Sequence, residues 1–280
     1  MLSYRHAFHA GNHADVLKHL TLYLVLNYFN QKDKPYWYID THAGAGAYNL
    51  NSTYAQKTQE YSNGFAQLTH ESNLPKQLQQ YISFIQNWQN NHPDLYPGSP
   101  EIAAQLLRST DALRLFELHP TDSKILIEHF RQKKTKAQIR VEDGFHGLIS
   151  LLPPAPRRAV ILIDPPYEEK HDYDKVVYTV TEGLKRFASG CFIIWYPCLA
   201  RVESQKLSER LRKISPDNFL DAKLIVNAPN ADGFGMFGSG VFVVNPPYRL
   251  QEQLQSILPD LVRVLGQDAQ ADYTLLAQIK

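Results

Sequence analysis

Residues 159–163 form a run of five apolar side chains, and Asp164, Pro165, Pro166 and Tyr167 follow it directly. A short β-branched run without a polar face is typical of a parallel strand covered on both sides. The two prolines cannot donate to a strand ladder, so the strand must end there and the chain leaves it stiffly. The sequence therefore predicts a carboxylate and an aromatic ring at the carboxyl end of a buried strand, where open α/β sheets bind ligands.

Strands and helices are predicted to alternate along most of the chain. A leucine-rich stretch without Gly or Pro predicts a helix over 14–29. Short apolar or aromatic runs predict strands over 36–39, 113–117, 139–141, 159–163 and 192–196. This order favours a doubly wound α/β fold with a mostly parallel sheet. Near the end, strands 220–226 and 240–244 are joined by a loop without a helix, which predicts an antiparallel pair.

The stretch 49–96 differs in composition from its surroundings. It is polar and rich in Gln and Asn, yet it carries apolar residues at helical spacing between Leu78 and Trp88. We interpret it as a helical insertion subdomain over 49–96, set into one domain made of 1–48 and 97–280.

Charge and cysteine content limit the possible partners and compartments. The formal net charge is +1, so a nucleic-acid surface would have to be a local basic patch, and residues 131–140 are one candidate. The two cysteines are too few for a disulfide framework. No stretch reads as a signal peptide or a spanning helix. We expect a soluble cytoplasmic protein that binds no membrane.

Acidic residues stand at the ends of four successive predicted strands: Asp40, Glu117, Asp143 and Asp164. Because the carboxyl ends of parallel strands meet at one edge of a sheet, these carboxylates are predicted to converge. Asp40 with the turn around Gly44 suits a cofactor entry, and Glu117 could accept both ribose hydroxyls. Asp143 could meet an adenine amino group. Each acid alone could also belong to an ordinary turn, so the prediction depends on their order.

Asp164 and Tyr167 suit a planar ring that carries an amino group. The exocyclic NH2 can donate to Asp164 and to the carbonyl of Pro165, while the ring stacks on Tyr167. A similar sequence begins at Asn245 and also follows an apolar strand. If that strand is antiparallel, it ends at the opposite face, so we expect Asn245 to be a structural stop for an edge or near-edge strand.

The amino terminus is rich in histidine, with His6, His9, His13 and His19 close together. A metal site is one reading, but there is no HExxH pattern and no nearby cysteine. We therefore expect no metal, and surface positions or contacts to the substrate or cofactor remain the alternatives.

Five segments together resemble the bacterial 23S ribosomal RNA adenine-N6 methyltransferases of the J type. They are 2–19 (LSYRHAFHAGNHADVLKH), 40–46 (DTHAGAG), 96–100 (YPGSP), 117–120 (ELHP) and 164–167 (DPPY). His42 stands where related methyltransferase turns often have their first glycine. The resemblance implies a Rossmann-like class I methyltransferase fold with a seven-stranded, mostly parallel sheet, an antiparallel last strand and a small helical insertion.

The resemblance also implies an activity and a set of residues. It implies a monomer that methylates the N6 of one adenine in 23S ribosomal RNA, with S-adenosyl-L-methionine as cofactor. The residues that we expect at the cofactor are Lys18, His19, Asp40, His42, Gly44, Ser99, Glu117, Asp143, Gly144 and Asp164. We expect Asp164, Pro165 and Tyr167 to be catalytic, and Tyr4 and His6 to contact the RNA. A DNA adenine methyltransferase and a non-enzymatic nucleotide-binding module remain alternatives.

Overall fold

The apolar run after residue 158 forms the strand β6 (Ala159–Ile163), and all its side chains are buried. This computed structural model describes residues 9–52, 60–131, 133 and 136–279. β1 (Trp37–Asp40) and β7 (Cys191–Cys198) flank β6, and both run parallel to it. The run is thus a strand in the middle of a parallel sheet, as its composition predicts.

The main sheet has eight strands in the order β10-β8-β9-β7-β6-β1-β4-β5. β4 (Ala112–Phe116) and β5 (Ala137–Arg140) extend the parallel part. Beyond β7, β9 (Gly238–Val244) is antiparallel to both β7 and β8 (Phe219–Ile225). The predicted antiparallel pair is therefore confirmed, but β9 lies in the interior of the sheet and the expectation of an edge or near-edge strand is wrong.

The eighth strand, β10 (Asp272–Gln278), was not among the seven predicted. It pairs antiparallel with β8 at the edge of the sheet. Its residues alternate between exposed and half-buried, so no fully apolar run marks it in the sequence. The predicted α/β fold is confirmed with one additional strand.

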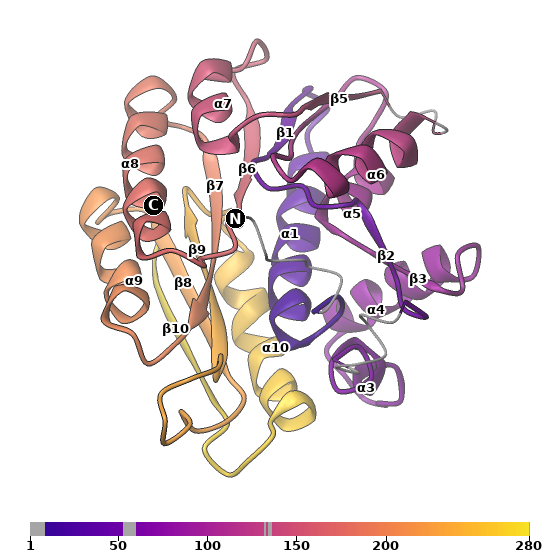
Figure 1. Cartoon of the computed structure of the whole chain (residues 1–280), viewed down its shortest axis with the longest axis vertical. Coiled ribbons are helices and arrows are strands. Elements are labelled where there is room, and N and C mark those ends of the chain that lie inside the picture. Colours follow the sequence, from indigo (N-terminus) through magenta and orange to yellow (C-terminus); the bar gives the residue numbers. More distant parts are fainter. Residues whose placement is uncertain (1–8, 53–59, 132, 134–135, 280) are drawn as a thin grey trace.

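Helices cover both faces of the sheet (Figure 1). One buried cluster contains residues of α1 (His13–Asn30), α5 (Ser99–Leu106), α6 (Pro120–Arg131) and α10 (Leu250–Leu265). The other contains residues of α7 (Gly144–Leu151), α8 (Lys170–Arg186) and α9 (Val202–Ile214). In the described part of the chain, no helix is long and apolar enough to cross a membrane.

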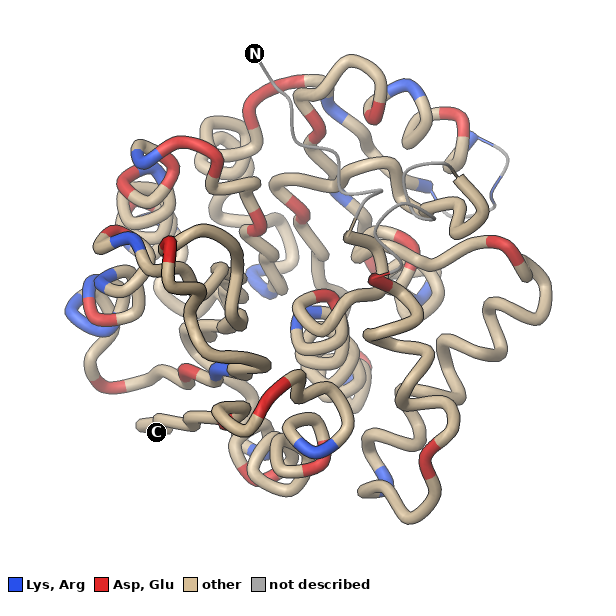
Figure 2. The backbone as a smooth tube through the Cα atoms, turned by 60° about the horizontal axis from the view of Figure 1, so that its bottom comes forward, with Lys and Arg blue, Asp and Glu red and all other residues tan. Residues whose placement is uncertain are grey.

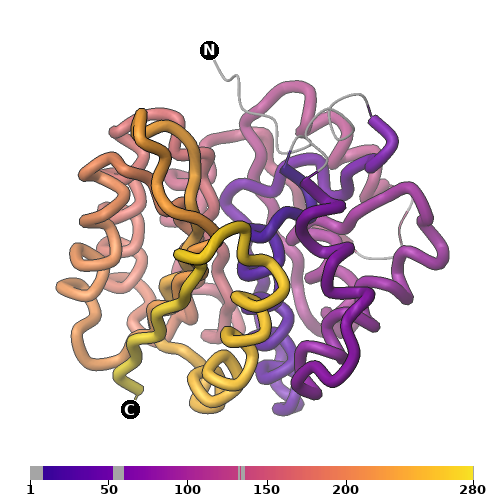
Figure 3. Tube along the Cα trace, turned by 90° about the horizontal axis from the view of Figure 1, so that it is seen from below, coloured from indigo at the N-terminus to yellow at the C-terminus, as the bar shows by residue number. Residues whose placement is uncertain are grey.

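The stretch predicted as an insertion contains α3 (Phe65–Thr69) and α4 (Lys76–Gln89), which lie beside α1 and α10 (Figure 1, Figure 3). Two short antiparallel strands, β2 (Ala47–Asn49) and β3 (Leu95–Pro97), bring its ends together. The apolar stripe of α4 is buried, as its helical spacing predicts. The packing explains why α1 is buried on most of its surface, since it lies between the sheet and this segment.

Candidate functional site

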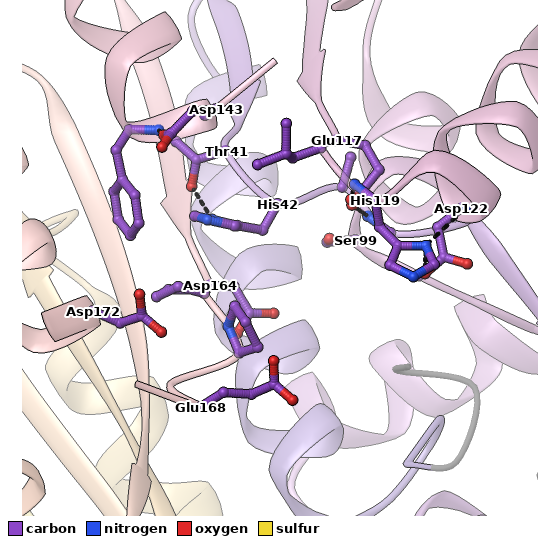
Figure 4. Close-up of a pocket in the computed structure, with 18 of the residues that line it drawn as sticks. Thr41, His42, Ser99, Glu117, His119, Asp122, Asp143, Asp164, Glu168 and Asp172 are labelled. Atoms are coloured by element: carbon purple, nitrogen blue, oxygen red, sulfur yellow. Dashed lines mark hydrogen bonds and ion pairs between the residues drawn. The ribbon is translucent and has the colours of Figure 1, made fainter. Parts of the chain in front are cut away.

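A cavity of about 370 Å³ lies at the carboxyl ends of the central parallel strands (Figure 4). Its wall includes most of the residues predicted from the sequence. They are Lys18, His19, His42, Gly44, Ser99, Glu117, Asp143, Gly144, Asp164 and Pro165. These residues come from helices and from loops that follow four strands, so the fold brings distant parts of the chain to one place.

Asp164 is held by a buried lysine. The Lys18 Nζ lies 2.7 Å from Asp164 Oδ2 and 2.8 Å from Asp15 Oδ1. Burial alone would lower the pKa of Lys18, but the two carboxylates outweigh it and raise the pKa above its ordinary value. Lys18 therefore stays charged and fixes one oxygen of Asp164.

A second cavity of about 190 Å³ adjoins the first, because Lys18, Asp164 and Pro166 line both. The remaining wall is largely apolar. It includes His9, Asn12, Ala14, Asp15, Tyr167, Trp195, Pro197, Leu199 and Met236. Asp164 thus stands at the boundary of two cavities of different size and composition.

Tyr167 belongs to the second cavity alone. Its ring is only 2% exposed and packs against Tyr173, with the ring centroids 4.7 Å apart. Its hydroxyl donates to the carbonyl of Trp195 at 2.7 Å, and its backbone has a positive φ of 53°. The ring is therefore held rigidly in the wall instead of projecting from it.

Asp40 does not line either cavity, contrary to its predicted place at the cofactor. It is fully buried and accepts hydrogen bonds from the hydroxyls of Tyr38 and Ser99, each at 2.7 Å. Burial raises its pKa to about 6, against the hydrogen bonds of Ser99 and Tyr38, which lower it. It also accepts from the backbone N–H of His42 at 3.2 Å. Asp40 therefore holds Ser99 and the backbone of His42 in place from within the core.

Glu117 is bound by two backbone groups at the cavity wall. Its oxygens accept from the N–H groups of Gly44 at 2.7 Å and His119 at 2.6 Å. Burial nevertheless raises its pKa to about 7, because desolvation outweighs these hydrogen bonds. Gly44 has a φ of +58°, and a Cβ there would meet the Tyr48 hydroxyl at 2.1 Å. The turn therefore requires glycine to bring its N–H to Glu117.

Asp143 and Gly144 open α7 at the next strand end. The Asp143 side chain caps the helix by accepting from the N–H of Phe145 at 2.8 Å and of His146 at 3.3 Å. A Cβ on Gly144 would lie 1.8 Å from the carbonyl oxygen of Thr41. Only glycine allows the first turn of α7 to approach the end of β1 so closely.

His42 is a neutral ring in the first cavity. Its Nδ1 lies 2.8 Å from Thr41 Oγ1, whose hydroxyl donates to the carbonyl of Leu162 at 3.1 Å. That hydroxyl proton is used, so we assign the remaining proton to His42 Nδ1, which leaves Nε2 as an acceptor. Burial lowers the pKa of His42 to about 4, in spite of the negative charge of Asp164.

Asn245 plays a different part from Asp164. Because β9 is antiparallel, Asn245 lies at the amino-terminal edge of β7 and outside both cavities. Its Nδ2 donates to the carbonyls of Ala188 and Gly190, both at 2.8 Å. Its contacts are those of a structural stop, which supports Asp164 as the residue of the site.

His9 and His19 of the histidine-rich segment pair with the carboxylates of Glu60 and Asp15. Tyr4 and His6 lie outside the described residues. Among the residues that are described, no group of three or more His, Cys, Asp or Glu side chains could hold a metal ion. In the candidate basic segment, Lys133 Nζ pairs with the buried Glu101 and Arg131 with Glu128. Figure 2 shows basic and acidic positions interspersed over the backbone.

Several wall residues escaped the sequence analysis. Leu118, His119 and Phe145 stand one or two positions after predicted acids, so their position next to a strand end was an available signal. Trp195 and Met236 had no such signal, because their place in the second cavity depends on how the antiparallel strands pair beside β7.

The family model for ribosomal RNA large subunit methyltransferase D, RlmJ, matches residues 33–276. The chain belongs to this family. Two relatives called ribosomal RNA large subunit methyltransferase J agree with this. The Escherichia coli K12 protein is 46% identical over 92% of both chains, and the Haemophilus influenzae protein is 43% identical over 98% of both. The resemblance to the J-type methyltransferases is therefore confirmed.

The crystal structure of another protein extends the likeness to three dimensions. Protein LPL1258 from Legionella pneumophila is 35% identical to this RlmJ-family chain, and the two superpose with a TM-score of 0.87. The match covers 97% of this chain and 99% of the other.

Proposed function

We propose that this chain transfers a methyl group from S-adenosyl-L-methionine to the N6 amino group of one adenine in 23S ribosomal RNA. Two relatives whose names describe large-subunit ribosomal RNA methyltransferases support the RNA substrate. The observation that carries the chemistry is Asp164, which lines both the larger polar cavity and the smaller, more apolar one. A donor in the first cavity and a base in the second would meet at this carboxylate.

The first cavity fits the cofactor because its wall carries suitable hydrogen-bond acceptors. Glu117 offers a carboxylate for two ribose hydroxyls, and the second oxygen of Asp143 remains to accept from an adenine amino group. The acidic wall, which also includes Glu168 and Asp172, suits a cofactor with a positive sulfonium and an ammonium group. We assign Lys18, His19, His42, Gly44, Ser99, Gly144 and Asp164 to the same site, and Asp40 to its support.

When bound, S-adenosyl-L-methionine supplies a methyl group on a positively charged sulfur that leaves as a neutral thioether. Asp164 Oδ1 and the Pro165 carbonyl would accept the two N6 hydrogens and turn the nitrogen lone pair toward the first cavity. Tyr167 and Trp195 would hold the ring of the base from the side. Once the new N–C bond forms, one amino proton must leave, and Asp164 is the carboxylate beside it. Most of the acceleration would come from orientation.

The second cavity can receive the adenine only after the base leaves its stack. Such extraction costs a few kcal/mol, and less where the base is already unpaired. We propose that residues 49–96 form an insertion subdomain that contacts the RNA, and that Tyr4 and His6 contact it as well. We also propose that the chain acts as a monomer in the cytoplasm without a metal ion.

The function is tested by methylation with tritiated S-adenosyl-L-methionine. The substrates are 23S ribosomal RNA from a strain that lacks this gene, the same RNA from the wild type, and genomic DNA. We expect label only in the deficient RNA, recovered as N6-methyladenosine. Label in DNA would favour a DNA adenine methyltransferase, and binding of the cofactor without any transfer would favour a nucleotide-binding module.

Substitution of Asp164 tests its assigned role in the same assay. Asp164→Ala should abolish methylation while the cofactor Kd changes little, because Glu117 and Asp143 bind other parts of the cofactor. Near-normal turnover of the variant would refute the assignment.

A further inference from the structure

Glu60 joins the predicted insertion to the segment that precedes α1. Its Oε1 lies 2.9 Å from His9 Nδ1, and its Oε2 accepts from Asn12 Nδ2 at 2.8 Å. Burial raises the pKa of Glu60, but the hydrogen bonds and charge of its partners bring it below the ordinary value. The carboxylate therefore favours its charged form between these two side chains.

A backbone hydrogen bond also joins the insertion to the segment before α1. The N–H of Phe65 donates to the carbonyl of Gly11 at 2.8 Å. A Cβ on Gly64 would lie 2.1 Å from that carbonyl oxygen, so the two segments touch through their main chains. Residues 60–65 therefore clasp residues 9–12, and we call this contact the Glu60 clasp.

Both side-chain partners of Glu60 line the second cavity and neither lines the first. Asn12 also caps α1, because its Oδ1 accepts from the N–H groups of Ala14 and Asp15, both at 2.9 Å. Asp15 in turn binds Lys18, which binds Asp164. A continuous series of polar contacts thus runs from the insertion to the carboxylate between the two cavities.

We propose that Glu60 is a positioning residue for the target base, which it serves by holding His9 and Asn12 in the wall of the second cavity. The inference rests on the proposed function, since it takes the second cavity as the place of the adenine. It adds that the insertion shapes this cavity through His9 and Asn12, and does so without touching the cofactor. Loss of the clasp should therefore weaken use of the RNA and spare the cofactor.

The test compares Glu60→Ala with Glu71→Ala in the full-length protein. Glu71 is a matched control, because it also ties the insertion to the rest of the fold, through Arg263 Nη1 at 2.7 Å. The two carboxylates are similarly exposed, at 30% and 31% of the side chain. Glu71 lines neither cavity. We expect Glu60→Ala to lower kcat/KM for deficient 23S ribosomal RNA about tenfold or more, as for a lost hydrogen bond to a charged group.

The cofactor Kd should stay within about twofold in both variants, and Glu71→Ala should keep the wild-type kcat/KM within about threefold, as for a surface ion pair. Glu60→Gln keeps an acceptor for Asn12 and should recover part of the loss. His9→Ala combined with Glu60→Ala should lower kcat/KM by less than the product of the two single losses, because both changes remove the same contact between His9 and Glu60. Equal losses in Glu60→Ala and Glu71→Ala, or a weaker cofactor Kd in Glu60→Ala alone, would overturn the proposal.

Amide hydrogen exchange separates this inference from the proposed function. Glu60→Ala should exchange faster than Glu71→Ala at residues 11–18, whether or not any RNA is methylated. Unchanged exchange there would overturn the clasp even in an active enzyme. If the wild type labels no RNA, the proposed function fails, and the role of Glu60 toward an adenine fails with it.

Discussion

Replacement of Glu117 by Gln should show how much of the cofactor affinity depends on the charge of this side chain, because Gln keeps nearly the same shape. Without cofactor, burial raises the pKa of Glu117 to about 7 from its ordinary 4.5. The proposed ribose hydroxyls would donate to the ionised form, so a proton on Glu117 competes with the cofactor. If only the carboxylate binds, the wild-type Kd should rise about twentyfold between pH 7.5 and pH 5.5. The variant should bind more weakly at pH 7.5 and vary little over this range.

Ionisation of Glu117 should strengthen cofactor binding but lower the stability of the folded protein. Between pH 4.5 and about 7 the folded protein binds more protons at Glu117 than the unfolded chain, so the free energy of unfolding falls as pH rises. The difference between 4.5 and about 7 corresponds to about 3 kcal/mol at most. Glu117→Gln removes this contribution, so its stability should decline less from pH 4.5 to pH 8. Asp40, whose pKa burial raises to about 6, acts in the same sense in both proteins and cancels in the comparison.

Two measurements check this reasoning on the cofactor-free protein. Titration calorimetry from pH 5.5 to pH 7.5 gives the cofactor Kd, and urea unfolding from pH 4.5 to pH 8 gives the free energy of unfolding. The wild type should gain affinity and lose stability over the interval in which Glu117 ionises. A wild-type Kd that does not change with pH would show that the cofactor does not bind the charged form of Glu117. Parallel stability profiles of the two proteins would show that burial does not raise the pKa of this side chain.

Two further substitutions test one glycine of the site and one residue outside it. Gly144→Ala places a Cβ 1.8 Å from the carbonyl oxygen of Thr41, so α7 must shift, and we expect thermal unfolding at a lower Tm with a weaker cofactor Kd. A wild-type Tm and Kd would contradict the close approach. Asn245→Ala loses the hydrogen bonds to the carbonyls of Ala188 and Gly190 and the one accepted from Asn218 Nδ2, and should lower stability by about 1–3 kcal/mol, while kcat at 25 °C stays near the wild-type value. A large loss of kcat in the folded variant would mean that Asn245 acts in the chemistry.

The sequence predicted the parts of the fold that depend on local patterns. The run 159–163, the helix around Leu17 to Val25 and the apolar stripe of α4 all show their burial in their composition. Glu117, Asp143 and Asp164 converge because parallel strands share one edge, which follows from the order of elements alone. β10 was missed because an edge strand with half-buried side chains has no distinct apolar run.

The partners within the site could not be read from the sequence. Asp40 ends a strand like the other acids, but its side chain is buried beneath the loop that follows β1. There it accepts hydrogen bonds from the hydroxyls of Ser99 and Tyr38. The link between Lys18 and Asp164 joins residues 146 positions apart, and no spacing rule brings them together. The second cavity depends on pairing between β7 and an antiparallel strand near the end of the chain. Such contacts follow from the completed packing.

The link between Lys18 and Asp164 also limits how the carboxylate can serve the reaction. Lys18 occupies Oδ2, so the other oxygen is the one left to accept from a base amino group. Lys18 is itself fixed by Asp15 and by the ring of Trp195, whose centroid lies 5.7 Å from Nζ. In the proposed reaction, the direction of the free oxygen would thus be set before a base arrives, and little reorganisation would be needed when the nitrogen attacks. Trp195 lines the second cavity and its ring lies against Lys18. In the proposed reaction, a base that displaced this ring would therefore also disturb Lys18 and, through it, the orientation of Asp164.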